Sequence, residues 1–199
     1  MIQFRDQEIA NERLVLESAT EVFYLGHNLT LRNCTLVIGV PARALVIART
    51  RLIGCSIEVK RELKNFRWQS VVLTGCRFKG RFTGNDFGEW PSAPGQGSID
   101  DCDFTEANLD QTRFLGCDAR RLRFPPWPCF TLLDPQQRHR ELTALPWPGD
   151  VGRGAMEICA EDPPSTRALT FSAPALAKRH GTTSEAIRAV LEKLDGVVF

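Results

Sequence analysis

Large apolar side chains recur at every fifth position in the stretch CDFTEANLDQTRFLGCDARRLRFPP, residues 102–126. They are Phe104, Leu109, Phe114 and Phe124, with Ala119 at the remaining position. An α-helix repeats its side-chain directions every 3.6 residues and a strand every two, so neither keeps this series on one face. A strand of an amphipathic sandwich, the alternative interpretation, would scatter the series over both faces. The pattern therefore predicts an extended chain that turns a corner after each five-residue segment.

Cysteines recur with a longer period that fits the same coil. Cys34, Cys55 and Cys76 are each 21 residues apart, in LRNCTL, LIGCSI and LTGCRF. In each segment an apolar residue stands three positions before the cysteine and another two positions after it. Four sides of five residues close a coil of about 20 residues, and stacked coils pair as parallel strands about 4.8 Å apart. The spacing therefore predicts one coil with an extra corner residue, and an internal ladder of cysteines.

The five-residue segments also share a composition. CDFTE and ANLDQ have a small residue, then Asp or Asn, then Leu or Phe, then two variable positions, while TRFLG and CDARR match in part. Upstream, CRFKG, GRFTG and NDFGE match with a slip of one residue. Residues 76–126 thus resemble the pentapeptide-repeat family, and residues 27–75 resemble it more loosely through the 21-residue period. The resemblance implies a right-handed quadrilateral parallel β-helix.

Earlier in the chain the apolar runs look like ordinary strands, rich in Val, Ile and Leu and bounded by Gly, Asn and Pro. We therefore expect the early coils to be less square than the later ones. The segment from about residue 11 to residue 126 predicts five or six coils and a rod about 25 Å long. The early strands are expected at 13–18, 21–26, 29–34 and 44–49.

The period is interrupted at GEWPSAPGQGS, residues 88–98, where Pro and Gly predict a loop that leaves the wall of the coil. Trp90 lies in this loop. We expect it to be exposed and to serve as an interface anchor, with the alternative that it folds back onto the wall.

The fold class that follows is mainly β: a right-handed parallel β-helix, pentapeptide-repeat-like, with a C-terminal α-helical capping region. We place the β-helix at residues 1–126 and an irregular and α-helical cap at residues 127–199, because the five-residue period stops after RFPPWPC. A solenoid end exposes unpaired strand edges and open core, so a cap is physically required there.

Within the cap, DPQQRHREL predicts a short helix at about 135–143 with Asp134 as its N-cap. The following segment is expected to be mostly irregular, with one apolar cluster, AMEICA. SAPALAKRHG and TTSEAIRAVLEKLDG then predict a helical hairpin, with a capping box of Thr182 and Glu185 in its second helix. That helix carries one apolar face for docking on the β-helix, formed by Ile187, Val190, Leu191 and Leu194.

Charge is balanced overall, with 25 Lys and Arg against 24 Asp and Glu, so no general field points to nucleic acid or an anionic membrane. The local distribution is uneven, because residues 43–81 hold ten basic side chains and only Glu58 and Glu62 as acids. This basic band is either a solvated outer wall or a surface for an acidic partner. Between residues 99 and 124 six acids face four arginines. The candidate partner-binding residues are Trp90 and nine of the ten basic residues: Arg49, Arg51, Lys60, Arg61, Lys64, Arg67, Arg77, Lys79 and Arg81.

Chemistry-bearing motifs are not found. The histidines at 27, 139 and 180 are scattered, and no nucleophile elbow or phosphate-binding loop is present. Cys129 and Cys159 are expected to be packed thiols, and an odd number of cysteines, seven, is expected to stay reduced. We therefore expect no catalytic residue, cofactor or metal. Without a signal peptide or a long apolar run, we expect a cytoplasmic protein of bacterial type with no membrane contact.

Three functions from different classes remain. The first is a protein-binding module of the inhibitor or immunity type, which binds a protein such as a toxin through the β-helix wall and the loop at 88–98. The second, implied by the family resemblance, is a DNA mimic that acts on a topoisomerase, although the middle coils here are basic. The third is a DNA-binding regulator that uses residues 172–195 as a helix-turn-helix, with Ala177, Gly181 and Ile187 at the motif's positions, although Glu185 and Glu192 weaken phosphate attraction.

Overall fold

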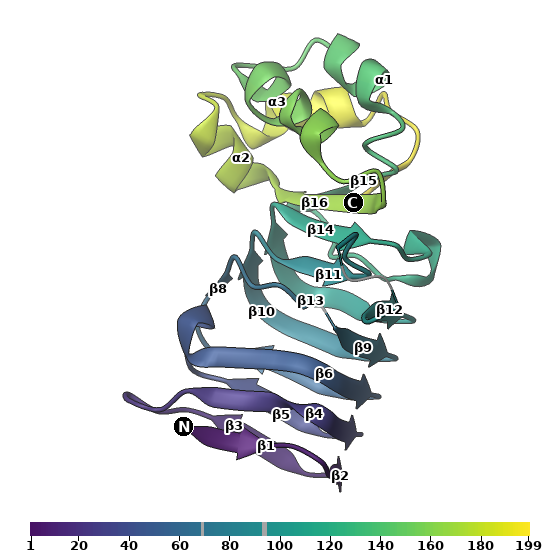
Figure 1. Cartoon of the computed structure of the whole chain (residues 1–199). Helices are drawn as coiled ribbons and strands as arrows, with labels where there is room; N and C mark the ends of the chain where they lie inside the picture. Colours follow the sequence, from purple (N-terminus) through teal and green to yellow (C-terminus); the bar gives the residue numbers. More distant parts are fainter. Residues whose placement is uncertain (69, 93–94) are drawn as a thin grey trace.

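Short extended segments joined by tight corners wind into a right-handed parallel β-solenoid, with a small helical region on its C-terminal end (Figure 1). The computed structural model describes residues 1–68, 70–92 and 95–199. Corners such as Asn33, Gly54 and Gly75 have φ between 51° and 62°, a conformation that Gly and Asn adopt most readily. These corners reset the strand direction and explain why side chains keep one orientation every 21 residues.

Parallel ladders form the walls of the solenoid. The first sheet contains β1 (Ile2–Phe4), β2 (Glu8–Ala10), β4 (Phe23–Arg32), β6 (Leu45–Ile53), β9 (Val71–Thr74) and β12 (Ser98–Asp100). The second contains β3 (Arg13–Leu16), β5 (Thr35–Ile38), β7 (Ser56–Val59), β8 (Leu63–Lys64), β10 (Arg77–Thr83) and β13 (Asp103–Asp110). One continuous register runs through five rungs of the first sheet, at Glu8, Thr30, Arg51, Val72 and Ser98.

The solenoid has about four turns, fewer than the five or six coils expected from length alone. The loop contributes to the difference, because residues 89–92 and 95–97 leave the wall between β11 (Asp86–Gly88) and β12 and so are not part of a coil.

The coils change shape along the axis, as the sequence predicted. A fourth straight side appears where β8, β10 and β13 stack Leu63, Phe82 and Leu109. On that side of the earlier coils the described residues form no strand, and the connection contains only the short η1 helix (Ala42–Ala44). Square coils therefore begin where the five-residue period begins.

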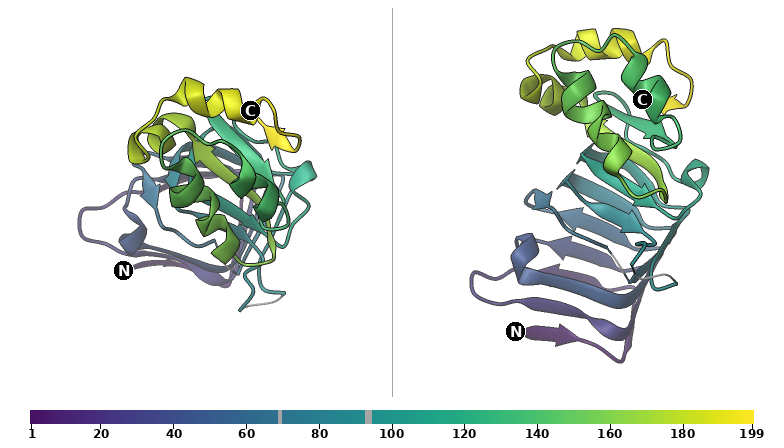
Figure 2. Two further views of the ribbon diagram at one scale, coloured as in Figure 1. Left: turned by 90° about the horizontal axis from the view of Figure 1, so that it is seen from above. Right: turned by 45° about the horizontal axis from the view of Figure 1, so that its top comes forward.

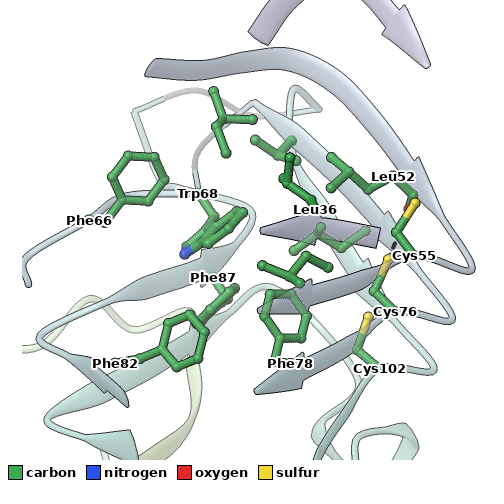
Figure 3. Close-up of a cluster of buried hydrophobic side chains, with 14 of the residues drawn as sticks. Leu36, Leu52, Cys55, Phe66, Trp68, Cys76, Phe78, Phe82, Phe87 and Cys102 are labelled. Atoms are coloured by element: carbon green, nitrogen blue, oxygen red, sulfur yellow. Dashed lines mark hydrogen bonds between the residues drawn. The ribbon is translucent and has the colours of Figure 1, made fainter. Parts of the chain in front are cut away.

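Stacked side chains fill the interior (Figure 3). Cys34, Cys55 and Cys76 form the expected ladder, since the residues that follow the cysteines pair in register. Cys102 continues it beside Cys76 (Figure 3), and all four cysteines are buried. A second column of aromatic rings follows the later coils. Phe78 stacks on Phe104 with ring centroids 4.4 Å apart, while Phe87 lies between Trp68 and Phe114 at 5.3 and 5.4 Å.

The thiols of Cys55 and Cys76 are held in their protonated form, while the hydrogen bond with Cys76 lowers the pKa of the Cys102 thiol. The contact with the Cys102 thiol, together with burial, raises the pKa of Cys76 to about 12. Burial likewise raises the pKa values of Cys117 and Cys159 to about 12. All seven cysteines are free thiols, and only Cys117 is less than fully buried.

We therefore predict that the native protein resists thiol reagents at pH 8. Titration with a chromogenic disulfide reagent should show at most one thiol reacting slowly, because the reactive thiolate is scarce and access is blocked. The same titration in denaturant should release all seven. Several thiols reacting within seconds in the native protein would show that the ladder is open to solvent.

The cap extends the third sheet of the solenoid. In this sheet β14 (Thr112–Leu115) pairs with β11 on one side and antiparallel with β16 (Thr166–Ser172) on the other. β16 then pairs with β15 (Cys129–Leu133), which pairs with β17 (Val197–Val198). The open edge of the solenoid is thus closed by strands, which sequence analysis did not predict, as well as by helices.

The helices lie above these strands (Figure 2). They are α1 (His139–Ala144), η3 (Gly152–Met156, a π-helix), η4 (Ile158–Glu161), α2 (Ala173–Arg179) and α3 (Ser184–Leu191). The short η2 helix (Ala119–Arg121) belongs instead to the last coil of the solenoid. None of the described helices has the length and apolar composition needed to cross a membrane. The cap has its own buried cluster, distinct from that of the solenoid, which includes Phe130, Leu142, Met156, Leu176 and Ile187.

Several details of the cap differ from the sequence predictions. α1 begins at His139 because Asp134 has φ 46° and forms a turn, in which its carbonyl accepts bonds from the Gln137 and Arg138 N–H groups. The AMEICA segment is helical instead of irregular. Thr183 is the N-cap of α3 in place of Thr182, since its hydroxyl accepts the Ala186 N–H at 3.1 Å. The apolar face of α3 is confirmed, since Ile187, Val190 and Leu191 are buried and Leu194 packs beside them. Its predicted docking on the β-helix is wrong, because the face packs in the cap's own cluster.

Candidate partner-binding surface

A groove crosses the outer face of β4, β6 and β9, beside the loop that leaves the wall after β11. We call it the loop-flanked groove; its volume is about 530 Å³. It is lined by Asn28, Leu29, Thr30, Arg49, Thr50, Arg51, Ser70, Val72, Gly95 and Gln96. The groove brings together two predicted binding residues, Arg49 and Arg51, and the predicted loop at 88–98.

Strand geometry explains why both arginines face outward. Thr50 and Leu52 point into the solenoid, so Arg51 between them points out, beside Thr30 on one rung and Val72 on the next. Arg49 lies at the bend of β6 with φ 52° and is exposed. The Thr50 hydroxyl donates to the Leu25 carbonyl at 3.0 Å, which fixes the bend from the inside.

Neither arginine of the groove forms an ion pair with a carboxylate among the described residues. By contrast, Arg32 at the end of β4 lies 2.8 Å from Glu8. The groove is thus lined by two arginines that have no carboxylate partner among the described residues, and planar guanidinium groups bind carboxylates with paired hydrogen bonds.

The loop is braced by one hydrogen bond within itself and by one hydrogen bond to the wall. The Gly95 N–H donates to Glu89 Oε1 at 2.7 Å, and the Ser70 hydroxyl donates to Gln96 Oε1 at 2.9 Å. Residues 93 and 94 of the predicted loop lie outside the described residues. These bonds hold Gly95 and Gln96 as one bank of the groove.

Trp90 is folded back onto the wall, so its predicted exposure is wrong and the alternative is correct. Its ring is half-buried, with the Arg67 guanidinium 4.8 Å and the Arg113 guanidinium 5.7 Å from the ring centroid. Cation–π attraction to two arginines holds a ring that would otherwise be exposed. The sequence did not reveal this contact, because Arg67 and Arg113 are distant along the chain.

Beneath Trp90 lies a buried ion cluster that sequence analysis missed. Arg113 donates to both oxygens of Asp86, at 2.7 and 3.1 Å, and to Asp162 Oδ1 at 2.7 Å. Burial opposes the charge of Arg113, but the two ion pairs outweigh burial and raise its pKa. Burial also raises the pKa of Asp162, against the effect of Arg113. The cluster joins the solenoid to the cap.

The remaining predicted basic residues do not form one patch. The basic band, residues 43–81, spans nearly two coils, so its side chains are distributed over every side of the solenoid. Lys79 pairs with Glu106 at 3.2 Å and Arg67 approaches Asp86 at 3.7 Å. The others are exposed at separate places, namely Lys60 and Arg61 after β7, Lys64 on β8, and Arg77 and Arg81 on β10.

The acidic stretch between 99 and 124 is largely neutralised by ion pairs. Asp100 lies 2.9 Å from Arg121, and Asp103 lies 3.7 Å from Arg123. Asp110 is buried and accepts bonds from Arg179 of the cap and from the Ser172 N–H.

The helical hairpin has its central basic residue engaged within the cap. Arg188 donates to Glu192 at 2.9 Å, and its guanidinium lies over the rings of Trp127 and Phe199 at 5.2 and 5.8 Å. This arrangement removes one cation from any contact with phosphate.

In the described part of the chain, no three His, Cys, Asp or Glu side chains form a cluster that could hold a metal ion. His27 contacts the Tyr24 hydroxyl at 3.0 Å, while His180 lies far along the chain in the cap. Comparison with family models, curated proteins and solved structures gave no match to this chain.

Proposed function

We propose that this protein is a non-enzymatic binding module of the inhibitor or immunity type, which holds an acidic protein partner in the loop-flanked groove. The observation that carries the proposal is the pair of exposed, unpaired arginines, Arg49 and Arg51, beside a tethered loop. We also propose that the solenoid is a divergent relative of the pentapeptide-repeat proteins, in which square coils are confined to the later turns.

Physical properties of the groove support this role. Its floor is built on hydrogen-bonded strands of the first sheet, so binding orders little backbone, and a preorganised surface loses less entropy. Val72 gives the groove an apolar patch between its polar banks. Partner carboxylates would meet two guanidinium groups, which gives specificity and fast association.

Affinity capture with three versions of the full chain tests the proposal. The three versions are the wild type, the groove variant Arg49→Glu with Arg51→Glu, and the matched control Lys60→Glu with Arg61→Glu. The groove variant and the control change the net charge by the same amount. We expect the wild type and the control to retain the same protein, identified by mass spectrometry, and the groove variant to lose it. Equal retention by all three versions would reject the groove as the binding site.

A second candidate function is action on a topoisomerase as a DNA mimic, which the square later coils favour. The ion pairs of Asp100, Asp103 and Glu106 weigh against it, because a mimic needs a row of unpaired acids. A gyrase supercoiling assay separates the two candidates: inhibition or protection at micromolar protein supports mimicry, and no effect removes it.

A further inference from the structure

The cap and the solenoid enclose a second cavity, which lies apart from the loop-flanked groove. We call it the junction cleft; its volume is about 280 Å³. The η3 and η4 helices of the cap form one side, and the solenoid corner at Asn65, Gly84 and Gln111 forms the other. Within the cap, Gly154 lets the His180 ring pack against η3, because a side chain there would collide with the ring.

The polar part of the cleft carries more acid than base. Asp86, Asp162 and Arg113 all line it, so two carboxylates share one guanidinium, and the formal charge is −1 with histidine counted as neutral. Arg67 also approaches Asp86, but its side chain is 58% exposed and it does not line the cleft.

Asp162 is the carboxylate with unused capacity. Both oxygens of Asp86 accept bonds from Arg113, whereas Asp162 accepts through Oδ1 alone among the described residues. The Asp162 side chain is partly buried, with 13% of its surface exposed. A partly buried carboxylate with a free oxygen can accept a further donor, and it binds a charged donor most strongly.

Other residues that line the cleft are apolar. Phe171 and Leu176 are buried beside it, and Ile158 stands at the rim with 57% of its surface exposed. An exposed isoleucine next to a cavity gives an entering alkyl chain an apolar surface to cover.

We propose that the junction cleft binds a primary ammonium group carried on a short alkyl chain. The ammonium pairs with Asp162, while the chain packs on Ile158 and Leu176. The volume of the junction cleft lies at the lower limit for ligand sites, so it suits a small ligand. An ammonium group is a compact point charge and fits such a cavity. An anion is disfavoured by the two carboxylates. A free alkylamine and a lysine side chain of a protein both carry such an ammonium group on an alkyl chain. The proposed site is independent of the proposed function.

Titration of the full, ¹⁵N-labelled chain with n-butylammonium chloride, followed by two-dimensional NMR, tests the proposal. We expect saturable shifts of the Gly84 and Gly154 amide signals with a Kd on the order of 1 mM, as befits five heavy atoms. The uncharged analogue 1-butanol should bind at least about tenfold more weakly, because it lacks the charge that Asp162 requires.

Two variants locate the site. Asp162→Asn should weaken butylammonium binding about tenfold, and Ile158→Asn should weaken it about threefold at an exposed position that does not support the fold. The spectra report whether each variant is folded, and Ile158→Asn decides the test if Asp162→Asn unfolds the cap. No saturable shift, or equal binding by wild type and Ile158→Asn, would overturn the proposal.

The source of the ammonium is distinguished with Nα-acetyl-lysine N-methylamide. Shifts at the same glycines would show that a lysine within a peptide enters the cleft. Binding of butylammonium without binding of the lysine derivative would assign the cleft to free amines.

Discussion

Replacing Phe87 with alanine is expected to lower the free energy of unfolding by about 3–5 kcal/mol. Phe87 is fully buried and lies between the stacked rings of Trp68 and Phe114. It also meets Phe78 and Phe104 edge to face, with centroids 5.2 Å from each. Removing the ring leaves a cavity that rigid stacked coils cannot fill by moving together, so both transfer energy and packing are lost.

Urea unfolding followed by circular dichroism measures this change. Phe199→Ala is the matched control, because Phe199 is 38% exposed and its loss should cost less than about 1 kcal/mol. A loss below about 1 kcal/mol for Phe87→Ala would mean that the aromatic column does not form as described.

Replacing Arg113 with alanine is expected to cost about 3–5 kcal/mol and to loosen the cap from the solenoid. The substitution leaves Asp86, only 6% exposed, and Asp162 without their shared partner. Two nearby buried carboxylates then repel each other in a poorly hydrated place, and Trp90 loses one of its two cation–π contacts.

Arg123→Ala is the matched control for Arg113→Ala. Arg123 is 73% exposed and its ion pair with Asp103 is 3.7 Å long, so its loss should change stability by less than about 0.5 kcal/mol. Hydrogen exchange should show faster exchange in β16 and η4 for Arg113→Ala alone. Equal stability of the two variants would show that the buried ion cluster does not join the cap to the solenoid.

The interior of the solenoid was predictable from sequence because each coil repeats the same geometric problem. Phe104, Leu109 and Phe114 keep a five-residue spacing, and Cys34, Cys55 and Cys76 keep a 21-residue spacing, only if corners recur at fixed intervals. The number of turns was overestimated, because the 21-residue period does not show how many residues lie in loops outside the solenoid wall.

The cap was less predictable because its strands carry no alternating pattern. In β16, six of seven residues are buried, including the polar Thr166, Thr170 and Ser172. Both faces of this strand are covered, by the solenoid and by the cap helices, so burial does not separate into apolar and polar positions. Such a strand is recognised only when its partners are known.

The candidate surface was predictable in part. The loop and the excess of arginines were visible in the sequence, but the grouping of Arg49 and Arg51 with Gly95 and Gln96 depends on which side of the coil each residue occupies. Trp90 was misjudged because its environment is made by Arg67 and Arg113, whose proximity arises only from stacking.

The most direct test of the proposed function is the affinity of the purified, captured partner for the groove variant and for its matched control. Isothermal titration at two salt concentrations should give a Kd at least about tenfold weaker for Arg49→Glu with Arg51→Glu than for the wild type. The control Lys60→Glu with Arg61→Glu should stay within about twofold of the wild type, with all proteins equally stable to heat. Equal Kd values for the groove variant and the wild type would contradict the proposal that this protein binds an acidic partner through the loop-flanked groove.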